Sequence, residues 1–93
     1  MREIERTSQF KRDYRREAKG QHRKSLEAVL VPVLVALAND QPLDPRYHDH
    51  ALSGEWKDFR DCHVKPDLVL IYQKHGADLL RLIRLGSHSE LGL

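Results

Sequence analysis

The sequence has few of the residues that staple small folds together. Its 93 residues include one cysteine, Cys62, which excludes an intramolecular disulfide framework and a cysteine-rich zinc site. Aromatic residues make up only 6% of the chain. Cysteine scarcity suits a reducing compartment, so we expect a cytoplasmic protein whose fold depends on a small apolar core.

Long apolar stretches are also missing. The longest mostly apolar run, Leu26 to Ala38, is interrupted by Glu27 and Pro32 and falls short of the roughly 20 residues that cross a bilayer. The N-terminal segment MREIERTSQF shows no apolar signal-peptide region. With 40% hydrophobic and 32% charged residues, the composition indicates one ordinary globular domain over residues 1–93.

Charge is distributed unevenly although the net charge is only +2. Residues 1–24 carry nine Lys and Arg against four Asp and Glu, whereas residues 25–56 carry one Arg against five acids. A basic N-terminal third indicates a surface that faces a polyanion. A solvated helix face is the simpler interpretation of the same charges.

Periodicity and turn signals predict two helices followed by three strands. Thr7 or Ser8 can begin a helix that runs to about Lys19, with an apolar stripe at Phe10, Tyr14 and Ala18. The segment Leu26 to Ala38 is apolar nearly all round, so we expect it to be buried. Its valines also suit a strand, but its length favours a helix with a kink at Pro32.

The remaining segments are predicted to be strands and connections. We expect a short strand at Arg2–Arg6, a loop over residues 39–55, strands at Trp56–Val64, Leu68–Gln73 and Asp78–Leu85, and a polar tail from Gly86. The order β-α-α-β-β-β predicts an α+β fold, in which two N-terminal helices pack on one face of a small, mostly antiparallel twisted sheet.

Candidate chemistry gathers at strand ends. His50 lies in the loop before the first long strand, His63 near the end of that strand, and His88 after the last strand. Asp67 lies in the turn after His63, so these two are expected to be close. Imidazoles beside a carboxylate can transfer protons near neutral pH, and Lys57 and Arg60 could neutralise a phosphate.

Other interpretations of these residues remain open. Three histidines also permit a zinc site with one open position, although they lack a tight local spacing. Ordinary surface histidines would explain them as well, and His22, His48 and His75 are expected to face solvent. Cys62 is expected to be a small apolar filler.

Three motifs together resemble one family. The loop Y-H-D-H-A-L-S-G-E-W at residues 47–56, the run R-D-C-H-V-K-P-D-L-V-L-I-Y at 60–72 and G-S-H at 86–88 are similar to the RelE/ParE superfamily of bacterial toxins, most closely its YafQ-type branch. The resemblance spans almost the whole chain and implies the RelE-like microbial RNase fold.

The resemblance also implies an activity. Members are toxins of type II toxin-antitoxin systems that cleave mRNA in the ribosomal A site. We expect no metal or other cofactor, because the 2′-OH of the RNA supplies the nucleophile. Carried over position by position, the catalytic set would be His50, His63, Asp67 and His88. The implied partners are the 70S ribosome, its mRNA and a cognate antitoxin of the DinJ/RelB-like, ribbon-helix-helix type.

That activity assigns a purpose to the basic N-terminal segment. We expect Lys11, Arg12, Arg15 and Arg16 to contact ribosomal RNA phosphates without reading sequence. Phosphate binding at the cut would fall to Lys57 and Arg60. We expect His88 to be the general acid, and Asp67 or His63 the base.

Two rival functions fit the same fold. One is a ParE-like gyrase poison, which would not need the histidine set, and the other is a catalytically inactive antitoxin-binding module. One departure from the family pattern also stands out. The chain ends His88-Ser89-Glu90-Leu91-Gly92-Leu93, without the aromatic residue that typically lies near the C-terminus of this branch.

Overall fold

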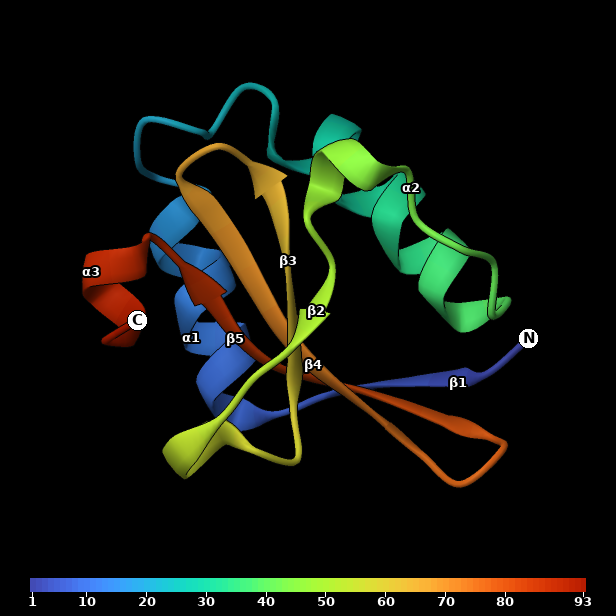
Figure 1. Cartoon of the computed structure of the whole chain (residues 1–93). Helices are drawn as coiled ribbons and strands as arrows, with labels where there is room; N and C mark the ends of the chain where they lie inside the picture. The colour runs from blue at the N-terminus through green and yellow to red at the C-terminus, as the bar shows by residue number, and fades with distance from the viewer.

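The computed structural model describes all residues, 1–93, as an α+β fold (Figure 1). Its sheet has five strands, and three α-helices and two short 3-10 helices connect or cover them. Along the chain the elements are β1 (Glu3–Arg6), α1 (Ser8–Glu17), α2 (Leu26–Ala38), η1 (Pro45–Tyr47), β2 (His50–Ala51), η2 (Gly54–Trp56), β3 (Arg60–Lys65), β4 (Leu68–His75), β5 (Leu79–Gly86) and α3 (His88–Leu91). None of the helices combines the length and hydrophobicity needed to span a membrane.

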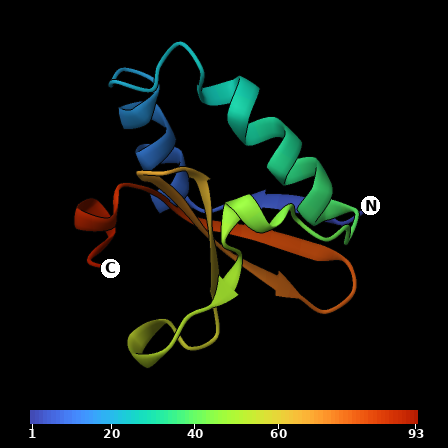
Figure 2. The same cartoon turned by 45° about the horizontal axis from the view of Figure 1, so that its top comes forward.

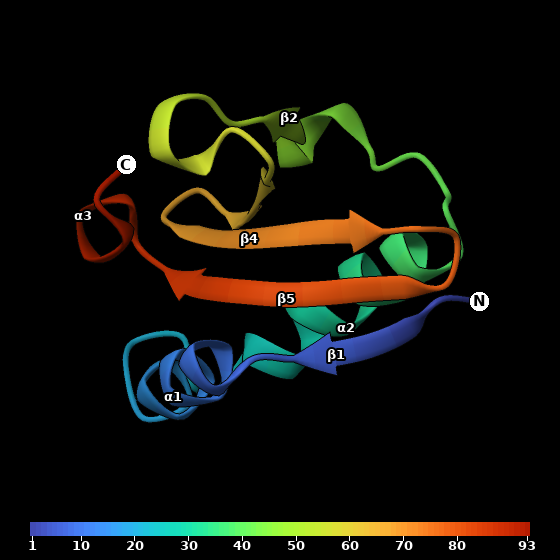
Figure 3. The ribbon, with the colours of Figure 1, turned by 90° about the horizontal axis from the view of Figure 1, so that it is seen from below.

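The sheet is mostly antiparallel, as predicted. Its strand order is β1-β5-β4-β3-β2, and only the pair β1 and β5 runs parallel. Figure 3 shows β5 lying between β1 and β4. The long antiparallel meander of β3, β4 and β5 follows from its short turns, which join neighbouring strands directly.

The two faces of the sheet have different cover. Helices α1 and α2 lie together on one side, as predicted (Figure 2). On that side Leu68, Leu70 and Tyr72 of β4 join the main core, whereas the alternate residues Val69 and Ile71 point to the opposite face. A smaller cluster forms there around Leu91 of α3. Most of the apolar packing is therefore on the helix side, and the other face keeps room for polar groups.

Helix α1 packs through a different stripe from the one predicted. Thr7 caps it by accepting a hydrogen bond from the Phe10 backbone N–H at 3.2 Å. Its buried residues are Phe10, Asp13 and Glu17, whereas Ala18 is exposed. Two carboxylates take the buried positions because basic side chains of the sheet and of α1 itself pair with them, which a hydrophobicity pattern does not reveal.

Helix α2 matches its predicted bounds but is not buried all round. Leu30, Val33 and Leu37 face the core, while Val31 and Val35 are 51% and 42% exposed. Ser25 precedes the helix without capping it by its side chain. Its hydroxyl instead accepts a hydrogen bond from the Lys65 Nζ.

Three boundary predictions are wrong. The strand expected from Trp56 begins only at Arg60, because Gly54, at φ +65°, starts a 3-10 turn that stacks Trp56 against Phe59. The loop of residues 39–55 contains the short strand β2, and the polar tail contains α3. Helix α3 had a local signal, the capping box between Ser87 and Glu90.

Candidate active site

Three histidines from separate segments converge at the end of β3. The ring centroids of His63 and His88 lie 4.9 Å apart with their planes nearly perpendicular, and those of His50 and His63 lie 6.5 Å apart. His50 comes from β2, His63 from β3 and His88 from the start of α3. The sheet therefore gathers the three predicted histidines on its face opposite α1 and α2, since Cys62 and Val64, the neighbours of His63, enter the main core.

A fourth imidazole adjoins this group. The ring of His48 lies 5.5 Å from that of His63, although its side chain was expected only to face solvent. His48 adopts a left-handed backbone conformation, φ 50°, at the end of η1. His75 is exposed as expected, while His22 is half-buried, with its Nδ1 3.5 Å from the Lys65 Nζ.

Asp67 contacts His88 and not His63. Its Oδ1 lies 3.6 Å from the Nδ1 of His88, and both side chains are well exposed. No ion pair joins Asp67 to His63, although the turn between β3 and β4 is as tight as predicted. The imidazole that Asp67 faces in this site is therefore that of His88.

Asp61 is part of the site and was not predicted. It pairs with His50 across β2 and β3, and its Oδ1 lies 3.1 Å from the His50 Nδ1. The Asp61 side chain is only 4% exposed, and this oxygen has no hydrogen-bond partner besides that contact. The alternation in β3 puts Asp61 and His63 on one face, so the period of the strand is the signal that could have found it.

Burial and mutual charge set the protonation of this group. Burial lowers the pKa of His63, and the neighbouring imidazoles of His88, His48 and His50 lower it further, while Asp61 opposes them. Burial likewise raises the pKa of Asp61, and the three imidazoles of His50, His63 and His88 counteract that rise. A neutral His63 is therefore favoured near neutral pH, which is the form that can accept a proton.

The two proposed phosphate-binding cations do not join the histidines. Arg60 shares the side of β3 that carries Cys62, and its Nη2 contacts Asp49 Oδ2 at 3.2 Å. The same aspartate accepts a hydrogen bond from the buried Tyr72 hydroxyl. Lys57 is exposed and follows η2, before the start of β3, whereas Asp67 follows the end of that strand. The Arg60 guanidinium is therefore paired on the other side of β3 from His63.

The basic residues of α1 divide into two groups. Lys11, Arg12 and Arg15 are exposed and form no ion pair. Arg16 instead contacts Asp13, Glu17 and Glu90 at 2.9–3.0 Å and donates to the Leu85 carbonyl at 2.8 Å. The structure therefore leaves three free cations on the predicted surface, and it uses the fourth to tie α1 to α3.

No set of three or more His, Cys, Asp or Glu side chains converges closely enough to hold a metal ion. The imidazole rings meet edge-on or tilted, at 73° between His63 and His88 and 59° between His50 and His63, and burial holds Cys62 as a thiol by raising its pKa. Imidazoles beside carboxylates are groups that can accept and donate protons near neutral pH.

Comparisons with known proteins identify a family. Residues 2–92 match the family of the bacterial toxin of type II toxin-antitoxin systems, YafQ. The mRNA interferase toxin YafQ of Escherichia coli (strain K12) is 38% identical over 90 residues, which cover 97% of this chain and 95% of the relative.

Two solved structures are similar throughout. The Escherichia coli DinJ-YafQ complex superposes with a TM-score of 0.81 at 38% identity and 98% coverage of both chains. A copper-bound mutant toxin from Helicobacter pylori gives a TM-score of 0.86 at 41% identity, covering 98% of this chain and 99% of that one.

Proposed function

Since the chain belongs to the YafQ family of toxins of bacterial type II toxin-antitoxin systems, we propose that it is a ribosome-dependent endoribonuclease that cleaves mRNA in the ribosomal A site. The observation that supports this most directly is the convergence of His50, His63 and His88 with Asp67 on the open face of the sheet. The small domain need not enclose its substrate, because the ribosome would hold the mRNA against it in the cytoplasm.

The proposed reaction uses the 2′-OH of the RNA as nucleophile. His63, favoured in its neutral form, accepts the proton of the 2′-OH while the oxygen attacks the adjacent phosphorus. The bond from phosphorus to the 5′-oxygen breaks, and His88 protonates that leaving oxygen. The products are a 2′,3′-cyclic phosphate and a free 5′-OH, so atoms and charge balance without an added reactant.

The two carboxylates have separate proposed tasks. Asp67 lies 3.6 Å from the Nδ1 of His88 and would orient that imidazole as the general acid. Burial favours the neutral form of His63, and Asp67 faces His88 instead. We therefore assign the role of base to His63. Asp61, at 3.1 Å from His50, would orient this third imidazole toward the charge that develops on the phosphate.

His88→Ala tests the proposed activity. A general acid contributes roughly 10²–10⁴-fold to the rate, so the variant should lose mRNA cleavage on programmed ribosomes by about that factor. His75→Ala is the matched control, because His75 is exposed at the far end of β4. Both variants should keep binding antitoxin, and unchanged cleavage by His88→Ala would contradict the assignment.

Metal independence is tested separately. We expect full cleavage of a suitable RNA after exhaustive EDTA treatment in a magnesium-independent assay, because imidazoles carry every proton transfer in the proposed reaction. Activity that disappears with EDTA and returns with zinc or copper would overturn this part of the proposal. A gyrase-supercoiling assay beside the cleavage assay separates the endoribonuclease from a ParE-like gyrase poison. Growth arrest on induction excludes an inactive binding module.

The proposed partner is a DinJ-type antitoxin. The Escherichia coli relative is seen in a DinJ-YafQ complex, and the exposed cations Lys11, Arg12 and Arg15 of α1 form a surface that an acidic, partly disordered segment would complement. Co-expression with the neighbouring gene should relieve growth arrest if that gene encodes this antitoxin.

A further inference from the structure

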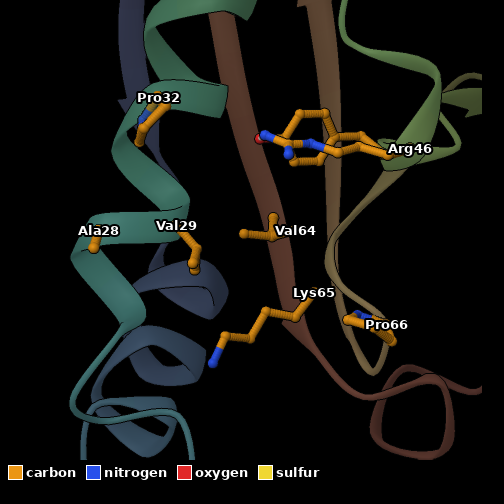
Figure 4. Close-up of a pocket in the computed structure, with 8 residues that line it drawn as sticks. Ala28, Val29, Pro32, Arg46, Val64, Lys65 and Pro66 are labelled. Carbon is orange, nitrogen blue, oxygen red and sulfur yellow. The ribbon is translucent and has the colours of Figure 1, made fainter.

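A cavity of about 490 Å³ lies between α2, η1 and the end of β3. Figure 4 shows Val29 of α2 and Val64 of β3 facing each other across it, with Pro32 above and Pro66 in the turn below. The ring of Tyr47 completes the lining. Its volume is within the range of small-molecule sites in proteins, and its walls are mainly apolar.

Two cations flank these apolar walls without a carboxylate partner. The Arg46 guanidinium carbon lies 4.9 Å from the centre of the Tyr47 ring, and its Nη2 donates to the Tyr47 hydroxyl at 2.9 Å. Lys65 donates through its Nζ to the Ser25 hydroxyl and forms no ion pair. No acidic residue lines the cavity. An occupant would therefore combine a flat apolar group with negative charge.

The cavity lies on the helix side of the sheet, and the histidine cluster lies across the adjoining sheet edge. Tyr47 precedes His48, whose ring lies 5.5 Å from that of His63, and Pro66 precedes Asp67, which contacts His88. Consecutive Cα atoms are about 3.8 Å apart, so Tyr47 and Pro66 of the cavity each lie one residue from a member of the histidine site. Strand β2 pairs only with Arg60 and Asp61, which leaves the last residues of β3 as the edge over which a strand of RNA can pass.

We infer that this cavity binds one unpaired nucleotide of the RNA substrate, next to the nucleotides at the cut. The base would lie against Tyr47 and the two valines, and its phosphate between Arg46 and Lys65. Aromatic rings combined with cations are how proteins hold single-stranded nucleic acid. The inference rests on the proposed endoribonuclease function and adds a subsite to it.

Charge and position favour RNA over an apolar peptide segment. The cavity has a cation at each side and no acidic lining residue, which suits a nucleotide better than an apolar peptide segment (Figure 4). Its lining residues Tyr47 and Pro66 also adjoin His48 and Asp67 in the chain. The C-terminal helix α3, His88–Leu91, contains no aromatic residue. Tyr47 is an aromatic residue that directly precedes His48 of the cluster.

Binding of uncleavable RNA tests the inference. The probes are a dinucleotide and a hexanucleotide with 2′-fluoro groups, which remove the nucleophile, and anisotropy gives each affinity. The wild type should bind the hexanucleotide about tenfold or more tightly than the dinucleotide. Tyr47→Leu and Arg46→Met should lose most of this gain in affinity. Arg46→Met should also reduce the slope of log affinity against log salt by about 0.7.

Matched variants separate the subsite from general effects. Tyr47→Phe keeps the ring and should retain the gain, and Lys19→Met removes an exposed, unpaired charge and should leave the gain unchanged. Thermal unfolding verifies that each variant is folded. An unchanged length gain in folded Tyr47→Leu and Arg46→Met overturns the inference. The same holds if these variants weaken only the complex with purified antitoxin, which would assign the cavity to a protein partner.

Chemical-shift mapping keeps the test decisive when binding is weak. The hexanucleotide should move the methyl signals of Val29 and Val64 together with the ring signals of His63, whereas the dinucleotide should move His63 alone. Shifts confined to His63 with both probes overturn the subsite and leave the proposed function standing. A hexanucleotide that moves neither set overturns the subsite, and cleavage on programmed ribosomes then decides the proposed function by itself.

Discussion

Asp61 shows how one buried carboxylate organises the site. Its Oδ1 meets the His50 Nδ1 at 3.1 Å, while the same nitrogen lies 2.7 Å from the His48 carbonyl oxygen. An imidazole held by two acceptors at Nδ1 carries its proton there and has a fixed ring orientation. Because Asp61 is 4% exposed, water does not screen its charge, which therefore acts on His63 as well.

Asp61→Asn should move the pH profile of cleavage to lower pH. Burial lowers the pKa of His63, and the negative charge of Asp61 partly reverses that shift. Removing the charge lowers the pKa of His63 further, so the base loses its proton at a lower pH and the acidic limb of the profile moves down. The measurement is the rate of mRNA cleavage by programmed ribosomes across pH 5 to 8, a range around the ordinary histidine pKa of about 6.5.

Asp58→Asn is the matched control, because Asp58 is exposed on the same segment and forms no ion pair. Its profile should equal that of the wild type. A lower rate at an unchanged pH optimum in Asp61→Asn would show that Asp61 only supports packing.

At the level of elements, a buried ion pair locks α1 to β5. Asp13 has no exposed side chain and contacts the Arg84 Nε at 2.7 Å, and its Oδ2 also accepts the Leu85 backbone N–H at 3.0 Å. Burial raises the pKa of Asp13, but the hydrogen bonds from Arg84 and Leu85 outweigh it and leave that pKa below the ordinary value. The helix is therefore positioned by charge as well as by Phe10.

Asp13→Asn should lower the free energy of unfolding by about 3 kcal/mol at neutral pH, because breaking a buried pair leaves a charge without its partner. Chemical denaturation measures the loss. A group whose pKa is lowered on folding stabilises above its unfolded pKa, so the difference between wild type and variant should shrink as pH falls below 3.8 and through the lower folded pKa.

The exposed pair of Glu5 and Arg81 supplies the control for this element. Its side chains are 47% and 35% exposed, so Glu5→Gln should cost no more than about 1 kcal/mol. Equal losses in Asp13→Asn and Glu5→Gln would mean that the pair between α1 and β5 contributes no more than a surface contact.

Over the whole molecule, opposite sides carry different proposed tasks. Helix α1 lies on one side of the sheet (Figure 2) and carries the exposed cations, and the histidines lie on the other face. A domain with its radius of gyration of 12.3 Å could then contact ribosomal RNA and mRNA at once. The net charge of +2 conceals this division because residues 25–56, with five acids against one Arg, offset the excess of Lys and Arg in residues 1–24.

Reversing Lys11, Arg12 and Arg15 to Glu should weaken ribosome binding and flatten its salt dependence, since each phosphate that is no longer neutralised reduces the slope by about 0.7–0.9. Sedimentation with ribosomes at several salt concentrations measures both effects. Catalysis on a small RNA should remain, because these residues lie away from the histidines.

Arg16→Glu should behave differently from that triple variant. It breaks contacts to Asp13, Glu17 and Glu90, so it should reduce stability first. Unchanged ribosome affinity in the triple variant would support the solvated-face interpretation of the basic segment.

Much of this arrangement follows from local pattern. The alternation of β4, the Gly and Pro turn signals and the apolar run of α2 predicted an α+β fold with two helices on one face, and the structure confirms it. The motifs likewise predicted the family, which the matched residues 2–92 confirm. The four proposed catalytic residues were named from the sequence, and their roles stay predictions.

The sequence by itself determined the segments and the residue types, because turns, caps and periodicity act over a few neighbouring positions. Only the tertiary structure decided which groups meet. It paired Asp67 with His88 instead of His63, placed Asp61 beneath His50 and turned Arg60 toward Asp49. Such contacts depend on strand register and on the sheet face to which each side chain points, and one residue of shift reverses that face.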